Sequence, residues 1–83
     1  MRIMFIEMVN TKNRKKRIIP FREFINYLEE RIKKETGIKE KYARSNILKI
    51  NYKFLNNETI QVGKYECSRY LLRRRGNAVN TEI

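Results

Sequence analysis

The chain has 83 residues, 41% hydrophobic and 35% charged, and its 20 Lys and Arg against nine acidic residues give a net charge of +11. One cysteine, no histidine and no aspartate exclude an internal disulfide, a histidine-based catalytic pair and an ordinary zinc site. The length allows one small core, which we place in a single domain over residues 1–76 with a flexible tail over 77–83. We expect a cytoplasmic protein, because no stretch resembles a signal peptide or a membrane span.

The N-terminal third predicts a β-hairpin with a basic tip. Residues 2–9 carry apolar side chains at odd and even positions, which is typical of a central strand covered on both sides. Mutual repulsion then keeps a run of five cations in solvent: Lys12, Arg14, Lys15, Lys16 and Arg17. We favour a second strand over residues 17–19 pairing back onto the first. The alternative is that the basic run leads directly into the next helix.

An amphipathic helix follows from Pro20, a residue that is favoured at helix starts. Gly37 is a suitable residue to end it. The apolar positions fall on one helical stripe: Phe21, Phe24, Ile25, Leu28 and Ile32. Two glutamates are spaced for i,i+4 pairs with lysines: Glu29 with Lys33 and Glu30 with Lys34. The helix therefore has one face for the core and one balanced, solvated face.

Residues 48–65 predict a second hairpin, whereas residues 38–46 remain ambiguous between a loop and a turn of helix. Apolar and polar side chains alternate without a break from Leu48 to Phe54, which is the pattern of a half-buried strand. A three-residue loop over 55–57, with Asn57 in the left-handed region, would pair Tyr52 with Ile60. A bulge at Gly63 would then bring Tyr65 onto the apolar face.

The C-terminal segment has Cys67, Tyr70 and Leu71 at helical spacing before Gly76, so we expect a short final helix, with a continued strand as the alternative. The predicted fold class is α+β. The elements follow the order β(β)αββ, and one main amphipathic helix packs on one face of a small antiparallel sheet.

The charge is unevenly distributed along this predicted fold. Residues 1–22 hold seven Lys and Arg against one Glu, residues 23–40 four against five, and residues 41–83 nine against three. If the helix covers the apolar face of the hairpin, the open sheet face and its flanks form a candidate polyanion-binding surface. Its candidate residues are Lys12, Arg14, Lys15, Lys16, Arg17, Lys49, Lys53, Arg69, Arg73, Arg74 and Arg75.

This charge pattern favours a non-enzymatic nucleic-acid-binding protein, of DNA or RNA, that contacts the phosphate backbone and needs no cofactor or metal. Tyr52, Tyr65 and Phe54 are expected in the core, while Tyr42 and Tyr70 are free to stack on unpaired bases. A residue usage rich in Ile, Lys and Asn fits an AT-rich genome such as that of a phage or mobile element.

Two alternatives of other classes remain. The first is a small inhibitor or adaptor, of phage origin for example, whose basic face docks on an acidic surface of a protein such as a nucleic-acid-processing enzyme. The second is metal-free RNA cleavage, chemically comparable to that of RelE-type ribonucleases, with Arg69, Tyr70 or Arg73 near the phosphate. A short exposed sheet edge would also permit a dimer.

Overall fold

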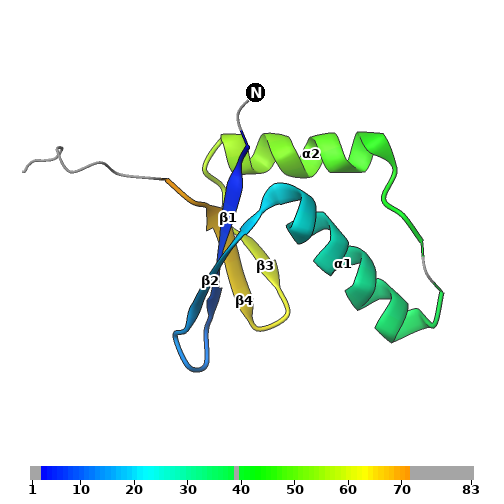
Figure 1. Ribbon diagram of the computed structural model, residues 1–83, viewed down its shortest axis with the longest axis horizontal. Helices are drawn as coiled ribbons and strands as arrows, with labels where there is room; N and C mark the ends of the chain where they lie inside the picture. The colour runs from blue at the N-terminus through cyan, green and yellow to red at the C-terminus, as the bar shows by residue number, and fades with distance from the viewer. Residues whose placement is uncertain (1–2, 39, 72–83) are drawn as a thin grey trace, which may run out of the picture.

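The computed structural model describes residues 3–38 and 40–71. Four strands and two helices follow in the order β1 (Phe5–Asn10), β2 (Lys16–Pro20), α1 (Phe21–Thr36), α2 (Arg44–Leu55), β3 (Ile60–Val62) and β4 (Tyr65–Arg69). The α+β class is confirmed (Figure 1). The order, ββααββ, contains one helix more than predicted between the two strand pairs.

The four strands form one antiparallel sheet in the order β2-β1-β4-β3. The predicted central strand is confirmed, because β1 pairs with β2 on one side and β4 on the other. The favoured N-terminal hairpin is also confirmed, with the basic run at its tip. Along β1 the side chains of Ile6, Met8 and Asn10 are buried, so the even positions face the core.

Helix α1 forms as predicted, starting directly after Pro20 and ending at Gly37. Gly37 has a φ of 77° and donates its N–H to the Lys33 carbonyl at 2.7 Å, which is an ordinary glycine stop. Phe24 and Ile25 are buried on the predicted apolar stripe. The expected pair of Glu29 with Lys33 is wrong: Glu29 is buried and its Oε2 instead accepts the Tyr42 backbone N–H at 2.9 Å.

The predicted strand over residues 48–54 is wrong, because these residues belong to helix α2. Ile47, Ile50 and Phe54 recur at helical spacing and pack into the core. Tyr52, expected in the core, is 67% exposed on the other side of the helix. The apolar residues of this segment fit both the two-residue repeat of a strand and the 3.6-residue repeat of a helix. Burial of Phe54 favours the helix.

A Schellman motif ends α2 in place of the predicted hairpin loop. Asn57 donates its N–H to the Phe54 carbonyl at 2.9 Å, and Glu58 donates to the Lys53 carbonyl at 3.0 Å. Asn57 has a φ of 61°, so the prediction that it adopts the left-handed conformation is confirmed. The hairpin loop predicted around it is wrong. The chain then turns into the sheet rather than pairing back on residues 48–54.

Strands β3 and β4 form a different hairpin from the predicted one. Val62 pairs with Tyr65, so Gly63 and Lys64 make a two-residue turn and Gly63 is not a bulge. Gly63 has a φ of 58°, at the position where type II′ turns need glycine. The expected helix starting at Cys67 is also wrong, since β4 continues to Arg69, as the alternative proposed.

Both helices cover the same face of the sheet, and Phe54 joins them. Its ring lies edge-on to Phe24 at 5.2 Å and to Phe21 at 6.3 Å between centroids. Phe24 and Phe54 belong to the buried core with Ile6, Met8, Ile19, Ile25, Val62 and Cys67, and the partly buried Phe21 packs against it. Within residues 3–38 and 40–71 the opposite face of the sheet is open, so the expected cover on both sides of β1 is wrong. Neither helix in the described part of the chain has the length and apolar character needed to cross a bilayer.

Candidate nucleic-acid interface

The turn between β1 and β2 is held by the side chain of Asn10, which is buried at the end of β1. Its Oδ1 accepts the backbone N–H of Lys12 at 2.9 Å and that of Asn13 at 3.3 Å. The Asn10 carbonyl accepts the N–H of Arg14 at 2.7 Å. Asn10 therefore organises the five-residue connection, residues 11–15, that carries the chain from β1 to β2.

The second half of this turn is fixed by Asn13 and Arg14. Asn13 Oδ1 accepts the Lys15 N–H at 2.9 Å. Arg14 has a φ of 65°, a left-handed conformation that costs a non-glycine residue about 1 kcal/mol or more. Glycine or asparagine would adopt this conformation with less strain. The chain therefore has a cationic residue at a position where the backbone conformation disfavours arginine.

The turn between β3 and β4 lies beside this tip. The backbone N–H and the hydroxyl of Thr11 both donate to the Lys64 carbonyl, at 2.8 and 2.9 Å. Lys64 is thereby fixed next to the first turn, although 47 or more residues separate it from the basic run. The sequence prediction missed Lys64 because it treated Gly63 as a bulge; a two-residue Gly-Lys turn was the available signal.

Five exposed cations lie in or next to the two hairpin turns, and we call them the hairpin-tip cluster: Lys12, Arg14 and Lys15 in the first turn, Arg17 near the start of β2, and Lys64 in the second turn. Within the described residues, no ion pair neutralises any of them. Lys16, the remaining cation of the predicted run, is paired with Glu7 at 3.2 Å on the open face. The cluster thus has five charges available to an external anion.

The other predicted site residues are not brought to this place. Lys49 and Lys53 lie on α2, which crosses the opposite end of the sheet from the hairpin tips (Figure 1). Arg69 is half-buried at the end of β4, opposite Ile6. Arg73, Arg74 and Arg75 lie outside the described residues.

The predicted basic face of the sheet is therefore wrong. Because residues 48–54 are helical, the open face carries Glu7, Glu66, Gln61 and Lys16 with apolar neighbours such as Ile18. Its two glutamates outnumber its one lysine, so these described residues offer no concentrated positive potential. Positive charge is instead divided between the hairpin tips and α2.

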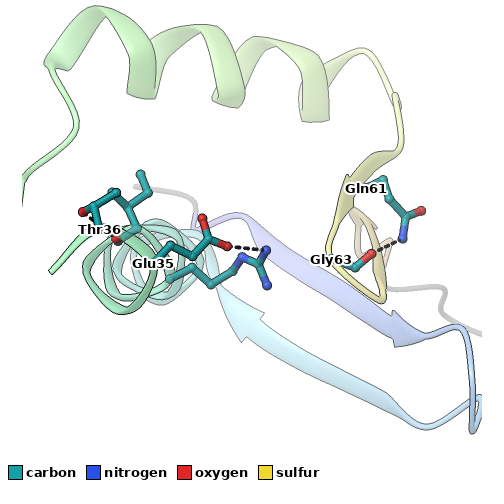
Figure 2. Close-up of polar contacts among 6 residues, drawn as sticks. Glu35, Thr36, Gln61 and Gly63 are labelled. Carbon is teal, nitrogen blue, oxygen red and sulfur yellow. Dashed lines mark hydrogen bonds and ion pairs between the residues drawn. The ribbon is translucent and has the colours of Figure 1, made fainter.

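Helix α1 approaches the same tips through Arg31. A Cβ placed on Gly63 would lie 2.7 Å from Arg31 Nη1, so the guanidinium lies close over the β3–β4 turn. Arg31 Nη2 also pairs with Glu35 Oε2 at 3.3 Å, and Gln61 Nε2 closes the turn by donating to the Gly63 carbonyl at 2.8 Å (Figure 2). Arg31 borders the cluster as an already paired charge.

The aromatic residues do not form a stacking platform at the tips. Tyr65 is half-buried against Tyr27, with ring centroids 6.2 Å apart, and Lys64 Nζ lies 6.0 Å from the Tyr65 centroid. Tyr42 and Tyr70, expected to be free, are both half-buried. The cluster is built to meet charge more than to stack on bases.

Cys67 lies buried in the middle of the sheet between Met8 and Ile60. Burial raises the pKa of its thiol to about 11, so the reactive thiolate is disfavoured at neutral pH. Residues 3–38 and 40–71 contain no group of three His, Cys, Asp or Glu arranged to hold a metal ion. The arrangement at the tips can bind and neutralise anions.

Comparison with models of known protein families, with curated proteins and with solved structures gives no match for this chain.

Proposed function

We propose that this protein binds the phosphate backbone of nucleic acid through the hairpin-tip cluster and catalyses no reaction on it. The single observation that most supports this proposal is the β1–β2 turn, whose backbone is fixed by Asn10 and Asn13 while its cations point into solvent. Like charges held together in this way repel one another. Such an arrangement becomes favourable when an anion is shared between them.

The expected energetics follow from counterion release. Five phosphate contacts predict a log-log salt slope of about −4.5 on duplex DNA. Because the turn is ordered before binding, less conformational entropy is lost than for a flexible basic loop. A two-stranded ribbon of this kind has the width that the DNA major groove admits, while contacts to RNA phosphates need only the same cations.

Two further elements belong to the proposal. Arg73, Arg74 and Arg75 are additional phosphate contacts, because guanidinium groups bind phosphate oxygens in pairs. The site of action is the cytoplasm, supported by a single cysteine that is held as a buried free thiol.

The proposal is tested by comparing two triple variants of equal charge. Lys12→Ala/Arg14→Asn/Lys15→Ala removes three cations from the tips, and Arg44→Ala/Lys49→Ala/Lys53→Ala removes three exposed cations from α2. Fluorescence anisotropy measures affinity for duplex DNA, single-stranded DNA and duplex RNA between about 50 and 200 mM salt. A third variant, with residues 73–75 changed to alanine, measures the C-terminal arginines separately.

We expect the tip variant to lose at least about tenfold in affinity and about 2.7 units of salt slope, and the α2 variant to lose much less. Equal losses in the two variants would mean that net charge alone attracts the polymer, which contradicts the proposal. So would unchanged binding by the tip variant, or no binding to any of the three polymers at about 50 mM salt. Gel analysis of the same RNA samples tests the ribonuclease alternative, since cleavage that Arg73→Ala abolishes would support it.

A further inference from the structure

Helix α2 has a second apolar stripe that the fold does not use. Ile47, Ile50 and Phe54 already bind α2 to the core. Leu48, Tyr52 and Leu55 lie on average about 130° further round the helix and are 60%, 67% and 49% exposed. Their spacing of four and three residues places them on one line along the helix. A stable, monomeric α2 would need none of these three side chains.

This stripe borders a shallow groove of about 490 Å³, lined by Leu48, Lys49, Tyr52, Lys53 and Glu58. Leu48 and Tyr52 are its apolar lining residues, and Lys49 and Lys53, each one residue later, lie about 100° further round the helix. Helix α2 contains three cations, Arg44, Lys49 and Lys53, and no acidic residue. The groove therefore combines an apolar line with a row of positive charge, and Glu58 is the one acidic residue among its lining residues.

We propose that this α2 groove binds an acidic amphipathic helix of a partner protein. Apolar side chains of such a helix, spaced i, i+4 and i+7, would cover Leu48, Tyr52 and Leu55. Its flanking carboxylates would pair with Lys49 and Lys53, which also steer the encounter. Tyr52 is suited to the centre of the contact, because tyrosine combines a large apolar ring with a hydroxyl at little entropic cost.

Charge selects this occupant over the other candidates for an apolar face. A second copy of the chain would bring Arg44, Lys49 and Lys53 against the same three cations, and like charges facing each other oppose binding. An anionic lipid surface would attract the lysines but repel the Glu58 carboxylate at the groove. A protein helix can place its carboxylates beside the lysines and leave Glu58 to accept a hydrogen bond.

The groove is independent of the proposed nucleic-acid site. Helix α2 crosses the end of the sheet at which β1 begins, whereas the hairpin-tip cluster lies where β1 ends (Figure 1). The two surfaces can therefore be occupied together, as in an adaptor that holds an acidic protein next to a polynucleotide. Each surface can also be removed by substitution without altering the other.

The test is selection from a display library of helical peptides of about 16 residues on the full, nuclease-treated chain. We expect enriched sequences with Leu, Ile or Phe spaced i, i+4 and i+7 and with Glu or Asp beside them. Selected peptides should lose at least about tenfold in affinity for Leu48→Ala/Leu55→Ala. The matched control is Ile18→Ala, which removes a similarly exposed apolar side chain from the open sheet face.

A charge exchange makes the test specific. Lys49→Glu/Lys53→Glu should lose the acidic peptides and gain binding to the same peptides with each Glu replaced by Lys. Enriched peptides that are neutral or basic, or that bind Leu48→Ala/Leu55→Ala unchanged, would overturn the proposal. It would also be overturned if no peptide is enriched, or if phosphatidylglycerol vesicles bind through Leu48 and Leu55 while peptides do not. Thermal unfolding of each variant establishes that α2 remains folded.

Discussion

Gly63 lies against the guanidinium of Arg31: a Cβ at Gly63 would come within 2.7 Å of Nη1 and 3.3 Å of Cζ. This approach links helix α1 to the β3–β4 turn and thereby to Lys64 in the hairpin-tip cluster. Gly37 offers a natural comparison, since it also has a positive φ but has nothing within 4 Å of its Cβ position. Comparing alanine substitutions at the two glycines therefore separates the energetic cost of backbone strain from that of a collision with a side chain.

Gly63→Ala and Gly37→Ala should each lower the free energy of unfolding by about 1 kcal/mol, because alanine is strained at positive φ. Gly63→Ala should lose only about 0.5 kcal/mol more, since the end of Arg31 can swing away at the expense of its surface ion pair with Glu35. Urea unfolding of both variants measures the difference. A much larger loss at Gly63 that Arg31→Ala does not relieve would mean that something other than Arg31 fills this space.

Phe54→Ala should lower the free energy of unfolding by about 3–5 kcal/mol, which is enough to unfold a chain of this size. The side chain is fully buried between Phe21 and Phe24, and no neighbour can easily replace it. Tyr52→Ala, two residues earlier, should change stability by less than about 0.5 kcal/mol because Tyr52 is exposed. Circular dichroism with urea titration measures both, and comparable losses would contradict the helical orientation of α2.

The sequence predicted the first half of the fold and misplaced the second. Three elements each have one dominant local signal. Strand β1 has apolar residues at odd and even positions, the hairpin tip has a run of cations, and helix α1 has a long apolar stripe that ends at Gly37. Residues 48–54 fit the patterns of both a strand and a helix, and the strict alternation of apolar and polar residues led to the prediction of a strand. The pair Ile47 and Phe54, seven residues apart, together with the Asn57 stop, was the signal for a helix.

The prediction of the site suffered from the same error. The cations of residues 12–17 were correctly predicted to be exposed, because a run of like charge cannot be buried, but Lys16 and Arg17 belong to strand β2 and not to the turn. Lys49 and Lys53 were placed beside them through a hairpin that does not exist. Lys64 joins the cluster through two hydrogen bonds from Thr11, a tertiary contact without a local sequence pattern.

Asn10→Ala should lower the free energy of unfolding by about 1 kcal/mol, because the N–H groups of Lys12 and Asn13 lose their shared acceptor. Nucleic-acid affinity should fall because the tip loses its order before binding, while the salt slope stays the same since no cation is removed. Asn10→Asp keeps the acceptor oxygen and should restore stability. A changed salt slope in Asn10→Ala would mean that the turn also determines the number of phosphate contacts.

Cys67 should make the protein less stable at alkaline pH. Burial raises its pKa from 9.0 to about 11, so between these values the unfolded chain loses its thiol proton while the folded chain keeps it. The stabilising contribution is therefore complete below pH 9 and is lost as pH rises through 11. Urea unfolding of the wild type and Cys67→Ala from pH 7 to about pH 11 isolates this effect from that of Tyr and Lys residues. Parallel pH profiles would show that the thiol has no part in it.

Arg14→Asn should separate the binding role of this residue from its structural role. Asparagine tolerates the left-handed backbone at φ 65° better than arginine, so stability should stay the same or rise by up to about 1 kcal/mol. Affinity for duplex DNA should nevertheless fall, and the salt slope should decrease by about 0.9, the share of one phosphate contact. Arg22→Asn is the comparison, because it removes an exposed arginine from α1, outside the cluster. If Arg14→Asn is more stable and binds as well as the wild type, then the strain at Arg14 has no connection to polyanion binding, and the proposed interface loses its most specific residue.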